Sequence, residues 1–327
     1  MLVSVVMSVY NSEGFLADSI NSILNQTFKD FEFIIIDDGS NDTSVDIIES
    51  FLLKDSRITF IRNEANLGLA ASLNKGILAA HGKYIARQDA DDISSLDRLE
   101  KQLKYATENE ALDLIGTDCY VIDILGQEIY KSSNQLKSAN YVDRILNRKG
   151  LFPHGSAFIK RSKLIEVGLY DTRFYYVQDG ELWLRFLSNG AHVSIMSEPL
   201  YFFRLGPISN AKRGLAKIMF NKILKLKYLD NKNSDVISDE LTKVQYFLRN
   251  SVAKSNSYYK SEYWKSLANA SYLNGTKVLV TYKYLLKAFL EKNALIDYPK
   301  YLFLAIIYLL PSEMVRKVLV TVNRNKS

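Results

Sequence analysis

Apolar runs of strand length alternate with segments of helical periodicity over the first 90 residues of the chain. The strand-like runs cover 3–9, 31–36, 58–61 and 84–86. Between them, apolar residues recur at helical spacing in 15–24, 45–52 and 69–80. The first run is rich in Val and alternates little, as expected for a strand buried on both faces. Strands separated by helices of this length predict parallel βαβ units.

The pattern becomes mixed after Asp92 and helical after about residue 215. Helical spacing is present at 96–105 and 181–187, the latter ended by Gly190, and short strands are expected at 112–115, 119–124, 156–159, 193–196 and 200–204. Gly, Pro, Ser and Asn cluster at 206–214, which is typical of a boundary. We therefore expect an α/β domain over 1–210 and an all-α region over 211–327.

Composition limits the class of protein. The chain has 327 residues, of which 47% are hydrophobic, enough for two domains with a sizeable core. The single cysteine, Cys119, excludes an internal disulfide and a zinc-thiolate cluster. It fits a reducing cytosol, and no secretory signal peptide is visible. We expect a cytoplasmic protein.

Charge is distributed unevenly. Residues 1–210 carry 21 Lys and Arg against 28 Asp and Glu, whereas residues 211–327 carry 21 against 8, a net charge of +13. The C-terminal region thus suits an anionic partner, either nucleic acid or a phospholipid surface. The ordinary alternative is a solvated charged surface.

Three carboxylates follow the fourth predicted strand. Asp89, Asp91 and Asp92 come directly after 84–86, at the carboxyl edge of the expected sheet, where open α/β sheets bind ligands. Carboxylates this close repel one another unless a cation or solvent neutralises them. Mn²⁺ and Mg²⁺ prefer such oxygen ligands. We expect a divalent metal here, with a phosphate bound to it.

Other motifs fall at the same edge. Tyr10 ends the first strand, where an aromatic ring can stack on a nucleobase. Asp37 and Asp38 end the second strand and can accept hydrogen bonds from a base or ribose, or can simply begin a helix. Residues 66–76 open a helix with small side chains, which favours close approach of a phosphate. Taken singly, each is weak.

Together these motifs resemble glycosyltransferase family 2, a group of enzymes with the GT-A fold. The resemblance covers about residues 1–210. Within the family, the sequence is most similar to enzymes of bacterial capsule, O-antigen and exopolysaccharide assembly. It implies an α/β, Rossmann-like mixed sheet flanked by helices. The matching segments are Val9-Tyr10-Asn11, Asp37-Asp38-Gly39-Ser40, Asn66-Leu67-Gly68, the Asp-x-Asp motif Asp89-Ala90-Asp91, and Gln178-Asp179.

The resemblance implies a role for each donor-side residue. Tyr10 would stack on the donor base, and Asp38 would contact the base edge, with Asp37 beside it. Asp91 would bind the metal, and Asp89 would contact the ribose or the water shell of the ion. The metal would neutralise charge that develops on the leaving nucleoside diphosphate.

The resemblance also implies a general base. Asp179 matches the carboxylate that takes a proton from the acceptor hydroxyl. Gln178 stands where the family usually has Glu, so the arrangement around the base is open to question. Glu181 is the second candidate for the base, although an acid at that position can simply begin a helix.

Two further residues match the family in part. His154, in the segment 152–156, is expected to contact the acceptor or the donor phosphate, or else to be a structural hydrogen-bonding residue. Arg204 stands where relatives place a basic residue near the pyrophosphate, and its ordinary alternative is a surface salt bridge.

The C-terminal region contains an apolar run at 302–310. Nine residues are too few to cross a bilayer, which needs about 20. Flanking basic and tyrosine residues suit a helix lying in the membrane interface, or else a buried helix of the C-terminal region. With the net charge of +13, this favours an anionic membrane surface over nucleic acid as the partner.

These observations predict a metal-dependent, inverting glycosyltransferase on the cytoplasmic face of the membrane. The expected donor is a nucleotide sugar, preferably a UDP-sugar, the acceptor a saccharide or lipid-linked saccharide, and the cofactor Mn²⁺ or Mg²⁺. Two alternatives stay open. One is a nucleotidyltransferase that makes a nucleotide sugar, although no basic phosphate loop follows the first strand. The other is a non-catalytic nucleotide-sugar-binding protein, suggested by Gln178.

Overall fold

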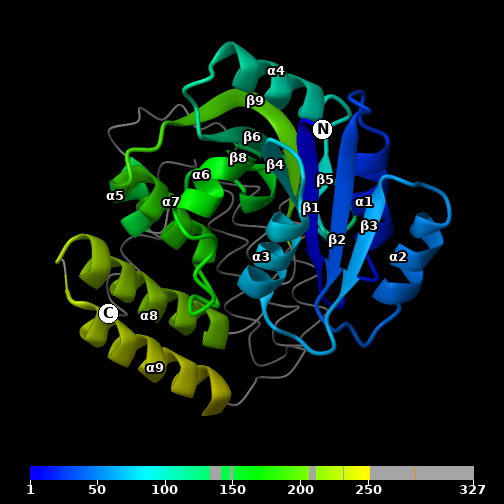
Figure 1. Cartoon of the computed structure of the whole chain (residues 1–327). Coiled ribbons are helices and arrows are strands. Elements are labelled where there is room, and N and C mark those ends of the chain that lie inside the picture. The colour runs from blue at the N-terminus through cyan, green and yellow to red at the C-terminus, as the bar shows by residue number, and fades with distance from the viewer. Residues whose placement is uncertain (133–140, 148–149, 206–210, 231, 251–283, 285–327) are drawn as a thin grey trace. The chain divides into compact units, whose positions relative to one another are not determined.

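The computed structural model of the chain describes residues 1–132, 141–147, 150–205, 211–230, 232–250 and 284 (Figure 1). The chain divides into two compact units. The first comprises Met1–Tyr120, Ser132–Phe203 and Gly214–Asn250, and the second comprises Val121–Lys131, Arg204–Arg213 and Ser251–Ser327. Apart from Arg204, every residue of the candidate site belongs to the first unit.

Four parallel strands form the centre of the first unit, as predicted. They are β1 (Val3–Val9), β2 (Phe31–Asp37), β3 (Ile58–Arg62) and β4 (Tyr84–Asp89), with helices α1 (Leu16–Leu24), α2 (Ser44–Leu52) and α3 (Leu69–Ala79) between them. β1 pairs with β2 on one side and with β4 on the other. The βαβ units expected from the apolar pattern are present.

Helices cover both faces of these strands (Figure 1). Ile34 and Ile36 of β2 pack in one core cluster with residues of α3. Phe33 and Ile35, on the opposite face of β2, pack with residues of α1 and α2. Both faces of the strand are therefore buried, which explains why its sequence does not alternate.

The remaining strands make the sheet mixed. The strand order is β3-β2-β1-β4-β8-β6-β9-β5, and β8 is antiparallel to both β4 and β6. The other strands are β5 (Ile93–Ser94), β6 (Leu114–Ile122), β7 (Glu128–Ser132), β8 (Phe158–Lys160) and β9 (Val193–Arg204). The other helices before residue 210 are α4 (Arg98–Glu108), α5 (Tyr141–Leu146), the short 3₁₀ helix η2 (His154–Ser156), α6 (Arg161–Glu166) and α7 (Gln178–Ser188). The α/β class with helices flanking a mixed sheet is confirmed.

The strands β4, β6 and β9 differ in extent from the sequence prediction, which also did not include β5 or β7. β4 continues to Asp89 instead of ending at residue 86, so the first acidic residue lies on the strand itself. The pairs of short strands expected at 112–124 and 193–204 are each one strand, β6 and β9. Buried polar residues interrupt the apolar pattern of β4 and β6, as at Gln88 and Thr117.

Helices α8 (Ala211–Tyr228) and α9 (Ser234–Asn250) continue the chain in the helical conformation expected there. Phe220 and Leu224 of α8 and Leu241 of α9 are buried in the core cluster that contains Leu182 and Trp183 of α7. Both α8 and α9 therefore contribute residues to the core of the first unit. The expected boundary near residue 210 stays a prediction, because apart from Tyr284 the chain after Asn250 lies outside the described residues.

The described part of the chain contains no helix long and apolar enough to cross a membrane. The apolar run at 302–310, on which the expectation of membrane contact depends, lies outside the described residues.

Candidate active site

The carboxyl ends of β1, β2 and β4 meet at one edge of the sheet. Val9 is paired with Asp37, and Ser8 is paired with Asp89. Tyr10 and Asp38 follow directly, so the motifs predicted to share an edge do share it. The Tyr10 residue is 47% exposed, which leaves its ring available for stacking on a ligand.

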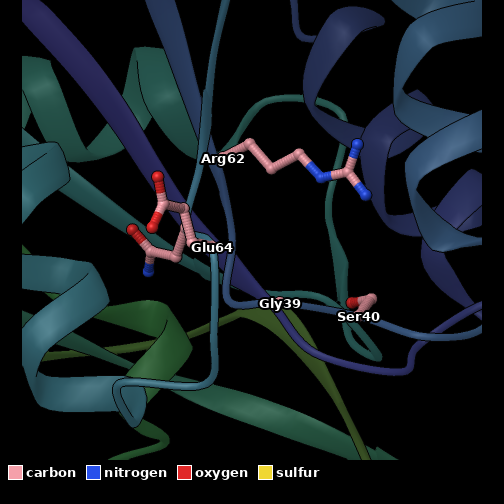
Figure 2. Close-up of a pocket in the computed structure, with 5 residues that line it drawn as sticks. Gly39, Ser40, Arg62 and Glu64 are labelled. Carbon is pink, nitrogen blue, oxygen red and sulfur yellow. The ribbon is translucent and has the colours of Figure 1, made fainter.

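A cavity of about 410 Å³ lies beside this edge, at the ends of β2 and β3. Gly39, Ser40, Arg62, Asn63 and Glu64 line it (Figure 2). The Arg62 guanidinium lies on the same side as Ser40, and the Glu64 carboxylate points to the opposite side (Figure 2). Sequence reasoning did not single out Arg62 or Glu64, although both lie at or after a strand end, as Tyr10 does.

Asp38 organises the loop beside this cavity. Its carboxylate accepts hydrogen bonds from the backbone N–H groups of Leu67 (2.8 Å) and Gly68 (2.9 Å) and from Asn63 Nδ2 (2.9 Å). Gly68 has a φ of +89°, a conformation that favours glycine. Asp38 thus holds the segment before α3 in place, and a contact with a base would have to share these carboxylate oxygens.

Asp37 has a similar local role. Its carboxylate is fully buried and accepts from the backbone N–H of Ser40 at 3.2 and 3.3 Å. Ser40 in turn accepts a hydrogen bond from the backbone N–H of Asn11 at 3.0 Å, which joins the loops after β1 and β2. Asp37 therefore holds in place the loop that carries Ser40, one of the residues lining the cavity.

A buried ion pair anchors the acidic turn, which comprises residues 89–92 and carries Asp89, Asp91 and Asp92. Arg87 Nη2 lies 2.7 Å from Asp89 Oδ1, and the Arg87 side chain is only 2% exposed. Burial acts to raise the pKa of Asp89, but the charge of Arg87 and the hydrogen bond from Arg87 outweigh it and lower the pKa. Asp89 is therefore an ionised carboxylate with a fixed orientation.

A second buried guanidinium, that of Arg98, lies in the same region. It donates to Gln88 Oε1 (3.1 Å), Ser94 Oγ (2.9 Å) and the carbonyl of Arg87 (2.9 Å). Burial lowers the pKa of Arg98 to about 10, so it remains charged at neutral pH. The two arginines supply positive charge to the acidic turn from within the protein. Sequence reasoning, which considered a bound cation or solvent as the source of neutralisation, did not include them.

The outer part of the turn carries the remaining carboxylates. Asp91 is exposed, whereas Asp92 is buried. Among the described residues, no group of three His, Cys, Asp or Glu side chains is arranged to hold a metal. Mn²⁺ and Mg²⁺ in nucleotide sites are usually bound by one or two carboxylates plus phosphate oxygens. The carboxylates of Asp91 and Asp89 fit that requirement.

The turn at η2 packs closely against Asp89. A Cβ atom on Gly155 would lie 1.8 Å from the Tyr201 hydroxyl and 2.7 Å from Asp89 Oδ2, so only glycine fits. The Tyr201 hydroxyl also accepts a hydrogen bond from the Asp89 backbone N–H at 3.2 Å. This contact brings His154, the neighbour of Gly155, to the acidic turn.

His154 forms a hydrogen-bonded pair with Tyr170, a residue that sequence reasoning did not identify. The distance from His154 Nε2 to the Tyr170 hydroxyl is 2.6 Å. Burial and then the Arg87 charge lower the pKa of His154 to about 4, against the opposing charges of Asp179 and Asp89. The imidazole is therefore neutral at physiological pH, and it lies within the electrostatic influence of both carboxylates.

Asp179 lies in the first turn of α7 and is half-buried. Its carboxylate has no hydrogen bond or ion pair with any residue that the structure describes. Val177, at the N-cap of this helix, has a φ of +55°, which is rare for a β-branched residue. Gln178 begins the helix beside the carboxylate. Asp179 thus has the unengaged oxygen atoms that a general base requires.

Glu181, two residues further along α7, is in a different environment. It is fully buried, and its carboxylate binds Arg185 (2.6 Å), Lys227 (2.8 Å) and the Tyr228 hydroxyl (3.0 Å). These contacts join α7 to α8. The geometry matches a structural acid in the first turn of a helix, the ordinary alternative for this residue.

Arg204 belongs to the second unit. Its Nη1 donates to the carbonyl oxygens of Asp123 (3.1 Å) and Ile124 (3.3 Å). Asp123 also accepts a hydrogen bond from the Tyr284 hydroxyl at 3.1 Å. The expected contact of Arg204 with a pyrophosphate stays a prediction.

Comparison with known proteins identifies the family. Residues 4–168 match the family described as Glycosyl transferase family 2. An uncharacterised glycosyltransferase of Methanocaldococcus jannaschii is 40% identical over 224 residues, which are 68% of this chain and 76% of that protein. The O-antigen biosynthesis glycosyltransferase WbnJ of Escherichia coli is 32% identical over 220 residues, which are 66% of this chain and 84% of that protein.

Solved structures share the fold at low sequence identity. The crystal structure of residues 1–349 of TarS from S. aureus in complex with UDP has a TM-score of 0.55 and 16% identity, and covers 89% of each chain. The mannosyltransferase PcManGT of Pyrobaculum calidifontis, in complex with GDP-Man and Mn²⁺, has a TM-score of 0.55 and 12% identity, and covers 99% of this chain and 86% of that one. These matches confirm the GT-A architecture. From its sequence and its fold, the chain belongs to glycosyltransferase family 2 and is a glycosyltransferase.

Proposed function

We propose that the protein transfers a sugar, with inversion, from a UDP-sugar to a saccharide or lipid-linked saccharide in the assembly of a surface polysaccharide. The observation that carries this proposal is the juxtaposition at one sheet edge. The exposed residue Tyr10 and the cavity lie beside the acidic turn. The carboxylate of Asp179, which has no hydrogen-bond partner among the described residues, acts electrostatically on His154 beside that turn. The O-antigen role named for WbnJ supports the polysaccharide assignment.

The donor would bind along the ends of β1 to β4. Tyr10 stacks on the uracil ring, a contact worth about 1–3 kcal/mol for a base on an aromatic side chain. Arg62, in the cavity wall, offers N–H donors that match the uracil carbonyl oxygens. Asp37 and Asp38, both buried, hold in position the loops that would surround the base and the ribose.

Asp91 would hold Mn²⁺ or Mg²⁺ together with the donor diphosphate, with Asp89 as a second ligand or a partner of the metal's water shell. When bound there, a divalent ion would supply positive charge that stabilises the departing diphosphate. Arg87 keeps Asp89 ionised and immobile for this purpose. If this assignment is right, Asp91→Ala weakens Mn²⁺-dependent UDP binding in calorimetry. Unchanged affinity would remove Asp91 as a ligand.

Asp179 is the proposed general base. It takes the proton from the acceptor hydroxyl as that oxygen forms the new bond to the anomeric carbon, and the bond from that carbon to the diphosphate breaks on the opposite face. Because the Asp179 oxygens have no partner among the described residues, no contact with that part of the chain must break before proton transfer. Glu181 is not available for this step, since its carboxylate is bound to Arg185 and Lys227.

The test is turnover by the full chain. Purified protein with Mn²⁺, a panel of UDP-sugars and mixed saccharide acceptors should release UDP only when a matching acceptor is present, and the product should have the inverted anomeric configuration by NMR. Release of UDP from no donor in the panel would contradict the donor assignment. Binding of UDP without any turnover would instead support the non-catalytic alternative suggested by Gln178. Family membership favours sugar transfer over nucleotide-sugar synthesis.

We also propose that residues 211–327 bring the enzyme to the anionic cytoplasmic face of the membrane, where a lipid-linked acceptor would lie. The net charge of +13 in this region supports the assignment, because each basic residue near an anionic leaflet contributes about 1 kcal/mol. Co-sedimentation with anionic liposomes at low salt tests it. Equal recovery with neutral and anionic vesicles would contradict it.

A further inference from the structure

Tyr170, a buried residue beside the candidate active site, is held by hydrogen bonds at its backbone and at its side-chain hydroxyl. The residue is 3% exposed. Its backbone is held by the Asn74 side chain of α3, which accepts from the Tyr170 N–H at 2.9 Å and donates to the Tyr170 carbonyl at 2.9 Å. Its hydroxyl lies 2.6 Å from His154 Nε2. Tyr170 therefore connects the helix that follows the Asn66-Leu67-Gly68 segment to the histidine at η2.

The direction of the Tyr170–His154 hydrogen bond follows from burial. A buried O–H without an acceptor is costly, because it gives up its hydrogen bond to water. Among the described residues, His154 Nε2 is the one acceptor that the Tyr170 hydroxyl contacts. A phenol is also a better donor than acceptor, whereas an unprotonated imidazole nitrogen is a good acceptor. The Tyr170 O–H therefore donates, and Nε2 accepts.

This direction determines the tautomer of the imidazole. A neutral imidazole carries one proton, so if Nε2 accepts, the proton must be on Nδ1. No side chain or backbone group that the structure describes forms a hydrogen bond with His154 Nδ1. His154 is half-buried, so part of the residue is exposed, and the Nδ1–H is free of partners among the described residues.

We propose that Tyr170 is a positioning residue, which fixes His154 as an Nδ1–H donor toward an oxygen of the bound substrates. This inference rests on the proposed function, because the substrates are those of the sugar transfer. The oxygen belongs to the donor diphosphate or to the acceptor saccharide, and both offer the same hydrogen-bond acceptor chemistry. A neutral donor suits a position within the electrostatic influence of Asp89 and Asp179, since it can bond an oxygen without forming an ion pair with either carboxylate.

The tautomer can be observed without any substrate. The chain has three histidines, His81, His154 and His192, so a ¹⁵N-histidine-labelled sample gives a short list of imidazole signals, and His154→Gln assigns those of His154. We expect long-range ¹H–¹⁵N spectra of the full chain at neutral pH to show a protonated Nδ1 and an unprotonated Nε2. In Tyr170→Phe, this preference should be lost. A protonated Nε2 in the wild type, or an unchanged spectrum in Tyr170→Phe, would overturn the proposal.

Kinetics separate positioning from packing. Tyr170→Phe keeps the ring and removes one hydroxyl, and we expect kcat/KM to fall roughly 3- to 10-fold, the usual effect of one hydrogen bond. The matched control is Tyr105→Phe on α4. It removes a hydroxyl that is hydrogen-bonded to Ser194 of β9 at 3.0 Å, and it should leave kcat/KM unchanged. Weaker UDP binding in Tyr170→Phe would identify the diphosphate as the partner, and a raised KM for the acceptor would identify the saccharide.

An equal fall in the two variants would mean a general packing effect and would contradict the positioning role. The spectra also keep the two proposals distinguishable. If the wild type transfers no sugar but shows the Nδ1–H tautomer, the proposed function fails while the link between Tyr170 and His154 stands.

Discussion

Two acidic residues in the first turn of α7 have opposite environments. Asp179 is half-buried, and its carboxylate has no hydrogen-bond or ion-pair partner among the described residues. Glu181 is fully buried and is bound by Arg185, Lys227 and Tyr228. Both positions suit the positive end of the helix dipole equally well. What separates them is the set of groups that other elements bring to each one.

This difference separates a stabilising carboxylate from a reactive one. A carboxylate with every oxygen engaged contributes to stability and resists protonation, whereas a base must have a free oxygen in reach of the acceptor. The comparison therefore predicts that neutralising Asp179 affects turnover with little effect on stability, and that neutralising Glu181 does the reverse. The isosteric variants Asp179→Asn and Glu181→Gln form a matched pair for this purpose.

The largest expected effect is on turnover. Asp179→Asn should lower the rate of sugar transfer by about 10²–10⁴-fold, because the amide cannot take the acceptor proton. UDP affinity should stay near the wild-type value, since Asp179 is assigned to the acceptor and not to the donor. Acceptor-dependent UDP release and calorimetry measure the two quantities.

Glu181→Gln is the control in the same assay. Its turnover per folded molecule should stay close to that of the wild type. If Glu181→Gln loses transfer while Asp179→Asn retains it, the two roles are reversed and Glu181 is the base.

The second effect is on the free energy of unfolding, which Glu181→Gln should lower more than Asp179→Asn does. Glu181→Gln leaves Arg185 and Lys227 without their buried counter-charge. Removing one partner of a buried pair costs about 3–5 kcal/mol, and partial exposure of the two cations reduces this to about 2–3 kcal/mol. Asp179→Asn should stay within about 0.5 kcal/mol of the wild type. Urea unfolding measures both, and equal losses in the two variants would contradict the comparison.

The sequence alone could not make this distinction. Lys227 and Tyr228 are 46 and 47 residues away from Glu181 along the chain, and helical periodicity carries no information about them. The same limit applies to Tyr170, whose hydrogen-bond partner His154 lies 16 residues away along the chain. By contrast, Tyr10, Asp38 and Asp89 could be placed together in advance, because the carboxyl ends of parallel strands share an edge.

The secondary structure could be predicted where the burial of apolar residues alone determines the sequence pattern. The first three strands and the first three helices lie within one or two residues of their expected positions, because apolar periodicity reports burial directly. β4 was predicted too short, because Arg87 and Gln88 are polar but buried. The Gln88 side chain is satisfied by Ser19, 69 residues away along the chain, and by Ser94, six residues away. Gly116 likewise interrupts the apolar pattern of β6, since a Cβ there would meet the Phe152 ring at 2.1 Å.

The smallest expected effect links Asp179 to the pH dependence of stability. The pKa of His154 is lowered to about 4, chiefly by burial, against about 6.5 in the unfolded chain. Between these values the unfolded chain binds more protons, so the free energy of unfolding falls as the pH is lowered from about 6.5 toward 4. Because His154 is partly exposed, we expect a loss on the order of 1 kcal/mol, measured by urea unfolding.

His154→Gln should lack the part of this loss that comes from His154 and is the control. The charge of Asp179 raises the pKa of His154, so Asp179→Asn should lower that pKa further and enlarge the loss. Glu181→Gln, less stable at every pH, should keep the wild-type pH dependence, because Glu181 is not among the charges that act on His154. If Glu181→Gln changes the pH dependence and Asp179→Asn does not, the charge next to His154 has been assigned to the wrong carboxylate.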